Sequence, residues 1–285
     1  MLIRTISGAI GLAVLAALLL LPAYVAAFTV LVASIIGLYE FSRAVAKKGV
    51  HVDLPVSIIA AVIIVAKAYG SNLPRELFPA LSEFFNGILG SKYLNAFMYI
   101  LIVYFFCKII FGKGKFCIED MAYTLLAIAY IPFLLSFAVA VRNLERGFTY
   151  IWLVVIGAVA TDTFAYFTGV TMGKTKIVPH ISPKKTVEGS IGGALGCMLV
   201  MILYGIFFIN KSHHFDVPLY HFAILGLLCG FVSQLGDWAA SSVKRITGIK
   251  DFGNLIPGHG GIMDRIDSIL FVAPLVYIYI SIFLM

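Results

Sequence analysis

Charged residues are scarce in this chain. Lys, Arg, Asp and Glu make up 12% of its 285 residues, while hydrophobic residues make up 61%; ordinary soluble domains carry about twice that share of charge. A fold surrounded by water could not bury so much apolar surface, so a soluble enzyme is excluded and a lipid bilayer is expected as the solvent. The net charge of +7 does not indicate a nucleic-acid partner, because the cations lie in short loops between apolar runs.

Cysteine is scarce as well, and its pattern excludes a redox or zinc motif. The four cysteines are Cys107, Cys117, Cys197 and Cys229, and they form no CxxC pair. Three of them lie inside apolar runs, where a thiol behaves as a small hydrophobic side chain. We therefore interpret them as core residues and expect neither a disulfide nor a cysteine-bound metal.

Long apolar runs occupy most of the chain. A membrane-spanning helix needs roughly 20 apolar residues, so the sequence predicts an all-α polytopic membrane protein with about nine transmembrane helices, over residues 5–22, 24–46, 54–70, 93–111, 121–141, 149–171, 190–209, 218–245 and 266–284. The mixed stretch 71–92 is predicted to be an interfacial helix. Residues 1–148, with about five spans, are expected to form a membrane scaffold. Residues 149–285, with about four spans and two polar loops, are expected to form the catalytic region.

The loop charges predict an orientation. Most of the 21 Lys and Arg residues fall on the N-terminal side of the predicted spans. Because cytoplasmic loops carry an excess of Lys and Arg, we expect a multi-pass protein of the cell inner (cytoplasmic) membrane with a cytoplasmic N-terminus. The polar loops 172–189 and 246–265 then lie on the cytoplasmic side. A polar cavity is expected to open there, where nucleotides are found.

Three acidic residues, Glu40, Asp162 and Asp237, stand inside apolar spans, where ionisable groups are costly and mark functional sites by default. Glu40 precedes Arg43 by three residues on one helical face, which favours a structural ion pair. Asp162 shares a face with Tyr166 and Gly169. We favour a wet cavity along that face over a protonated acid that packs between helices.

The eighth predicted span carries a polar stripe. Ser233, Asp237, Ser241 and Lys244 recur at helical spacing, so their side chains share one face of the helix. A stripe of this composition cannot face lipid. It must face other helices or water.

A glycine-rich segment follows at residues 246–265, and its backbone N–H groups can approach a ligand closely. Its ionisable side chains, with those of the helix that begins there, are Lys250, Asp251, His259, Asp264, Arg265 and Asp267. Carboxylates among cations suit a magnesium–triphosphate complex, because Mg²⁺ commonly takes one or two carboxylates and completes its shell with phosphate and water. The alternative is a re-entrant loop that only anchors the ends of two helices.

The second polar loop spans residues 172–189. Ser182 and Pro183 are typical of an N-cap and a first helical position. They predict a helix that presents Lys184 and Lys185 at its positively polarised end, to an anionic headgroup or a polyphosphate. An ordinary positive-inside loop is the alternative. The GxxxG spacing of glycines within residues 189–196 predicts close helix packing.

Taken together, these residues resemble the signature of the phosphatidate cytidylyltransferase (CDP-diacylglycerol synthase) family. The matching positions are Ser241, Lys244, Arg245, Lys250, Asp251, Gly253, Pro257, His259, Gly260, Gly261, Asp264, Arg265 and Asp267. Residues 182–193 (SPKKTVEGSIGG) and Asp162 with Ala165-Tyr166 are similar to two further blocks of that family. Val187 departs from the pattern, since an aromatic residue is expected there. The resemblance covers residues 150–285.

The resemblance implies an activity. A member of this family is a nucleotidyltransferase of phospholipid biosynthesis that transfers CMP from CTP to phosphatidic acid and gives CDP-diacylglycerol and pyrophosphate. The resemblance further implies Mg²⁺, and a second cation would match the usual two-metal arrangement for in-line displacement. It also implies an all-helical membrane fold and a homodimer.

Roles for individual residues follow from this reading. The predicted metal ligands are Asp237, Asp264 and Asp267, and Asp237 and Asp264 also belong to the predicted catalytic set. The other predicted catalytic residues clamp or orient phosphates, and they are Lys244, Arg245, Lys250, His259 and Arg265. The predicted substrate-binding residues are Asp162, Ser182, Lys184, Lys185, Ser241, Gly260 and Gly261.

Two other functions remain open. A CTP-dependent polyprenol kinase would transfer a phosphoryl group instead of a cytidylyl group. A cation-coupled transporter would use Asp162 and Asp237 as ion sites and would need polar groups through both leaflets. Here the polar groups gather on the predicted cytoplasmic side, which favours an enzyme.

Overall fold

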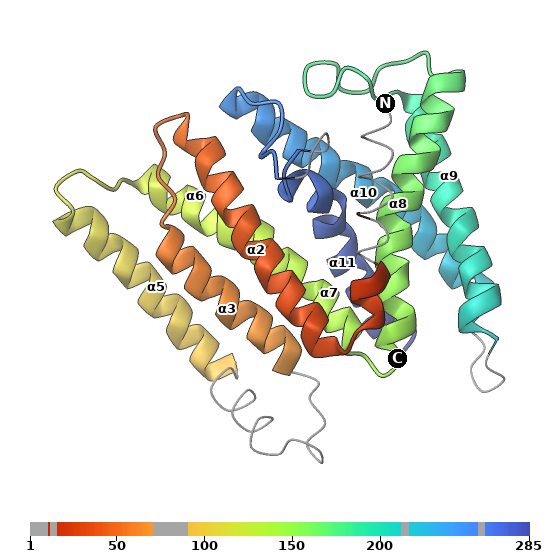
Figure 1. Ribbon diagram of the computed structural model, residues 1–285, viewed down its shortest axis with the longest axis horizontal. Coiled ribbons are helices and arrows are strands. Elements are labelled where there is room, and N and C mark those ends of the chain that lie inside the picture. The colour runs from red at the N-terminus through yellow and green to blue at the C-terminus, as the bar shows by residue number, and fades with distance from the viewer. Residues whose placement is uncertain (1–10, 12–15, 71–90, 212–216, 256–259) are drawn as a thin grey trace. The chain divides into compact units, whose positions relative to one another are not determined.

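The structure is a computed structural model that describes residues 11, 16–70, 91–211, 217–255 and 260–285 (Figure 1). Across those ranges it is helical and has no strand, only an isolated bridge between Lys176 and Thr186. The chain divides into two compact units. The N-terminal unit is Met1–Asn143 with Phe252–Ile262, and the C-terminal unit is Leu144–Asp251 with Met263–Met285.

The N-terminal unit is built on α2 (Ala23–Ala46), α3 (Leu54–Gly70), α5 (Ser91–Phe111), α6 (Ile118–Ile128), the π-helix η1 (Ala129–Phe133) and α7 (Leu134–Arg142). Helix α2 packs against α3 and α7, and α2 and α3 run side by side in Figure 1. The wide η1 turn holds Pro132 inside a continuous helix, where its missing N–H would otherwise leave a broken turn.

Buried polar contacts link the loop before α3 to helices α5 and α6 of this unit. Asp53 is 6% exposed and accepts the Tyr104 hydroxyl at 3.0 Å. It also pairs with the Lys108 ammonium group, and its backbone N–H donates to Thr124 Oγ1 at 3.0 Å. Because each buried group has a partner, α3, α5 and α6 are fixed relative to one another without an unsatisfied charge.

The C-terminal unit is a bundle of α8 (Gly147–Met172), α9 (Val187–Tyr204) with the π-helix η2 (Gly205–Ile209), α10 (Leu219–Thr247) and α11 (Met263–Phe283). Glycines let these helices approach closely, as the spacing within residues 189–196 predicted. A side chain at Gly193 would lie 2.9 Å from Ala165 Cβ of α8. One at Gly230 of α10 would lie 3.0 Å from Ala194 Cβ of α9.

Six helices within the described ranges are long and apolar enough to cross a membrane: Ala23–Ala46, Ile118–Arg142, Gly147–Met172, Val187–Ile209, Leu219–Thr247 and Met263–Phe283. Two more apolar helices, Leu54–Gly70 and Asn95–Phe111, are shorter. A multi-pass membrane protein is thus confirmed, while nine spans remain a prediction. Most of the predicted span 5–22 and most of the interfacial helix 71–92 lie outside the described residues.

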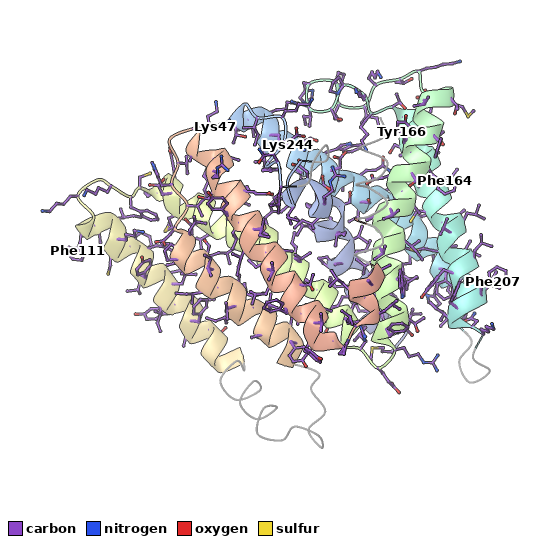
Figure 2. The ribbon with its side chains drawn as sticks, viewed as in Figure 1. Lys47, Phe111, Phe164, Tyr166, Phe207 and Lys244 are labelled. Atoms are coloured by element: carbon purple, nitrogen blue, oxygen red, sulfur yellow. The ribbon has the colours of Figure 1, made fainter. Side chains whose placement is uncertain are left out.

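Large apolar side chains project outward from both units, as a lipid solvent requires. Phe111 of the N-terminal unit is 76% exposed and Phe207 of the C-terminal unit is 61% exposed (Figure 2). In water such surface would be costly. In a bilayer it is the expected outer face.

Candidate active site

The polar stripe of α10 meets the start of α11. Lys244 Nζ lies 2.7 Å from Asp264 Oδ1, and the two side chains are 12% and 3% exposed. Ser233 and Ser241 of the same stripe are buried, as is Asp267 of α11. The stripe therefore faces neighbouring helices, as its composition predicted, and Figure 2 labels Lys244 near the end of α10.

Glycine makes this helix crossing possible. A side chain at Gly236 of α10 would come within 3.1 Å of Ser268 Cα and still closer to the Asp267 carbonyl oxygen. The missing side chain lets α10 and α11 approach, which brings Asp237 toward the first turns of α11. Ser268 Oγ then donates to the Ser233 carbonyl oxygen at 3.2 Å and locks the crossing.

Lys185 enters the site from the loop between α8 and α9. Its Nζ lies 3.0 Å from Asp237 Oδ2, and the side chains are 28% and 24% exposed. Burial alone would lower the pKa of Lys185, but the carboxylates of Asp237, Asp162 and Asp267 outweigh it and hold that pKa above its ordinary value. The ammonium group is therefore charged at neutral pH.

The helix that follows the Lys185 loop does not begin at the residue that the sequence predicted. Ser182 and Pro183 do not begin a helix, because the backbone N–H of Lys185 donates to the Ser182 carbonyl oxygen at 3.3 Å and closes a turn. Pro is equally suited to the second position of such a turn. Helix α9 begins at Val187, and the N-cap is Thr186, whose Oγ1 accepts the Gly189 N–H at 3.2 Å.

Two side chains outside the loop hold it in place. Glu188, in the first turn of α9, accepts the backbone N–H groups of Lys174 at 3.0 Å and Thr175 at 3.2 Å. Arg245 Nε of α10 donates to the Ile181 carbonyl oxygen at 3.1 Å. Arg245, predicted from sequence to clamp phosphate, thus uses one of its N–H groups to position the loop.

A cavity of about 330 Å³ lies between α8, α9 and this loop. Asp162, Tyr166 and Gly169 line it from α8, as the spacing of these residues predicted, and Lys184 and Lys185 line it from the loop. Ligand pockets commonly measure about 300–1,000 Å³. The cavity is large enough for the phosphate-bearing part of a nucleotide or of a lipid headgroup.

Sequence reasoning missed several residues of this cavity: Lys176, Thr186, Ser190 and Gln234. Gln234 is 1% exposed, and its Nε2 donates to the carbonyl oxygens of Gly230 at 2.8 Å and Ser190 at 3.2 Å, so it ties α10 to α9. Gln234 places an amide inside an apolar predicted span, next to Ser233 of the polar stripe, and this was a signal that the sequence offered. Thr186 followed by Glu188 was also readable as an N-cap with an acid in the first helical turn.

The remaining predicted residues, as far as the structure describes them, do not line this cavity. Lys250 and Arg265 are exposed cations of the C-terminal unit. Gly260 and Gly261 belong to the N-terminal unit, and Gly260 has a φ of 84° that favours glycine. His259 lies outside the described residues. The roles predicted for all of these residues stay predictions.

Comparison with known proteins identifies the family. The sequence pattern of the Cytidylyltransferase family matches residues 2–283. This chain belongs to the cytidylyltransferase family. A phosphatidate cytidylyltransferase of Staphylococcus aureus (strain COL) is 33% identical over 276 residues, 97% of each chain. A phosphatidate cytidylyltransferase of Bacillus subtilis (strain 168) is 35% identical over 208 residues, 73% of this chain and 75% of the relative.

The donor set of this cytidylyltransferase fits a magnesium–phosphate complex. No group of three or more His, Cys, Asp or Glu side chains arranged for a metal occurs in the part of the chain that is described. Mg²⁺ does not need such a group, since it is bound in nucleotide sites by one or two carboxylates with phosphate and water. Asp237 and Asp264 each lie beside a lysine. Carboxylates can therefore take the metal while the lysines take phosphate oxygens.

Proposed function

We propose that this protein transfers the cytidylyl group of CTP to phosphatidic acid and forms CDP-diacylglycerol and pyrophosphate. The observation that carries the proposal is the match to a phosphatidate cytidylyltransferase over 97% of both chains. The site supports it independently, because two lysine–carboxylate pairs lie within one helical unit whose cavity Lys185 lines. Such a set suits two polyanionic substrates.

The reaction dictates what the residues must do. A phosphate oxygen of phosphatidic acid attacks the α-phosphorus of CTP, a new P–O bond forms, and the bond from the α-phosphorus to the bridging oxygen of pyrophosphate breaks. The nucleophile is already an anion, so a strong general base is not required. The barrier is repulsion between two anions and the charge that develops on pyrophosphate, and fixed cations lower it most.

Named residues take these tasks in the proposal. Lys185, positively charged and lining the cavity, binds phosphate oxygens there. Lys244 does the same at the start of α11 and keeps Asp264 oriented. Arg245 and Glu188 hold the loop so that Lys185 stays in place. Because these groups are fixed by packing before substrate arrives, little reorganisation is needed during the reaction.

Mg²⁺ belongs to the proposal as well. Asp237 and Asp264 would hold it, with support from Asp267 and Asp162. When bound, the ion neutralises charge on the triphosphate and the leaving pyrophosphate. Removal of divalent cations with EDTA should abolish turnover, and added Mg²⁺ should restore it. Full activity in excess EDTA would contradict this part of the proposal.

The proposal also covers the membrane in which the protein lies, its orientation there and its oligomeric state. We infer that the protein lies in the inner membrane with the cavity open to the cytoplasm, because the loop cations favour that orientation and CTP is cytoplasmic. We also propose a homodimer, on family resemblance. Labelling of single-cysteine variants in Lys174–Thr186 and in Asn210–Lys211 with a membrane-impermeant reagent tests the orientation. With the reagent added outside intact cells, cysteines in the first loop should stay unlabelled. They should react only after the membrane is permeabilised.

The activity itself is tested with purified protein, Mg²⁺, phosphatidic acid and CTP labelled in the cytidine ring. Label should move into the lipid fraction in proportion to enzyme, and only when phosphatidic acid is present. Lipid without label, despite a folded and magnesium-supplied protein, would refute the assignment.

A further inference from the structure

The N-terminal unit holds a buried acid whose partners lie at the far end of the sequence. Glu40 of α2 is 6% exposed. The backbone N–H of Ile262 donates to Glu40 Oε1 at 3.1 Å, across 222 residues of sequence. Arg43, the partner that sequence spacing suggested for Glu40, lies with its guanidinium carbon 5.8 Å from the ring centre of Tyr39. The structure thus links Glu40 to the end of the glycine-rich segment 252–262 that lies at Ile262.

Two glycines of that segment pack closely against the Glu40 carboxylate. A side chain at Gly253 would lie 2.9 Å from Glu40 Cδ and 3.2 Å from Gly261 Cα. One at Gly261 would collide with Glu40 Cδ and with both carboxylate oxygens. Neither glycine has a φ in the left-handed region. Glycine at these two positions therefore allows the close approach of Glu40, whereas their backbone conformation does not require it.

The position of this contact in the sequence gives it a consequence for the reaction. Gly253 follows Asp251 by two residues, and Ile262 is followed directly by Met263, the first residue of α11. Asp264 comes next. An acid in an apolar helix is costly, so the hydrogen bond from the Ile262 N–H to the Glu40 carboxylate favours the observed placement of this end of the segment.

We propose that Glu40 is a positioning residue, which fixes both ends of the glycine-rich segment and thereby the start of α11 with its catalytic carboxylates. This inference rests on the proposed function. It assigns the N-terminal half of the chain a part in the reaction beyond a scaffold.

The test compares Glu40→Ala and Glu40→Gln with two control variants of the same unit. Glu119→Gln changes an exposed acid on α6. Thr124→Val removes a buried hydroxyl that accepts the Asp53 N–H, so it loosens the unit without touching Glu40. Each full-length protein is measured for thermal stability, for cytidylyl transfer, and for hydrogen–deuterium exchange in peptides that contain Gly261 and Ile262.

Glu40→Ala should speed amide exchange at Gly261 and Ile262 and lower kcat by about 10- to 100-fold, the cost of misplacing reacting groups by roughly 1 Å. The KM for CTP should change less than kcat. Glu40→Gln keeps an oxygen for the Ile262 N–H and should restore most of the rate. Thr124→Val should lower stability while leaving exchange at Ile262 and kcat near those of the natural chain.

A double variant, Glu40→Ala with Gly261→Ala, tests the contact between these two residues directly. Gly261→Ala should impair the natural chain, yet cost little more in a Glu40→Ala background, because the colliding carboxylate is gone. If the activity losses of Glu40→Ala and Gly261→Ala multiply in the double variant, the proposal is overturned. Unchanged exchange at Ile262 in Glu40→Ala would also overturn it, as would faster exchange with unchanged kcat, which would leave Glu40 a structural residue only. If the natural chain transfers no cytidylyl group, the proposed function fails and the positioning role fails with it, while the exchange data still report on the contact.

Discussion

Lys185 and Lys184 are adjacent lysines in one loop, and the structure predicts different consequences for losing them. Lys185 is paired with Asp237 at 3.0 Å, whereas Lys184 is exposed at the cavity rim. Lys185→Met keeps the length of the side chain and removes its charge. It takes away both a phosphate ligand and the partner of Asp237.

The size of the effect can be worked out from the contact. A hydrogen bond to a charged group contributes about 1.5–3 kcal/mol, and about 1.4 kcal/mol is a tenfold change. Lys185→Met should therefore lower kcat/KM for CTP by about 10- to 150-fold. An exposed pair contributes about 0–1 kcal/mol, so Lys184→Met should cost about fivefold at most.

The assay is transfer of labelled cytidine to lipid at varied CTP, with thermal denaturation in detergent to show that both variants are folded. Lys184→Met is the matched control for loop charge. A folded Lys185→Met enzyme within threefold of the natural one would refute the reasoning. Equal large losses in both variants would do the same, because they would mean that net loop charge matters and the Asp237 contact does not.

Three further substitutions test other parts of the site. Asp264→Asn should leave the protein folded and lower kcat by about 100-fold or more, the range seen when one fixed electrostatic group is lost; near-normal turnover would remove it from the site. Arg245→Lys keeps the charge but lacks the Nε that holds Ile181, so it should be nearly as slow as Arg245→Ala, and full activity in the lysine variant would return Arg245 to a pure charge role. Gly236→Ala should lower the unfolding temperature, since an extra methyl group against Ser268 costs about 1–3 kcal/mol; an unchanged unfolding temperature would argue against the close crossing.

The helices and the main carboxylates could be predicted from the sequence because their signals are local. Apolar runs give helix positions, and helical spacing places Asp237 and Lys244 on one face of α10. These inferences need only neighbouring residues.

Contacts that depend on tertiary packing could not be predicted in this way. Ser182-Pro183 suits a turn as well as a helix start, and only the pairing of the loop with the Thr186 cap decides between them. The approach of Lys185 to Asp237 depends on that same loop conformation. Glu40 had a plausible partner three residues away, so nothing local indicated Ile262, 222 residues distant.

The most direct test of the central claim follows two labels in parallel. Purified enzyme with Mg²⁺ and phosphatidic acid is given CTP labelled in the α-phosphate or, separately, in the γ-phosphate, with Asp264→Asn as the inactive control. A cytidylyltransferase must place the α-label in lipid and release the γ-label as pyrophosphate. Lipid that carries the γ-label would show phosphoryl transfer by a kinase and would contradict the account.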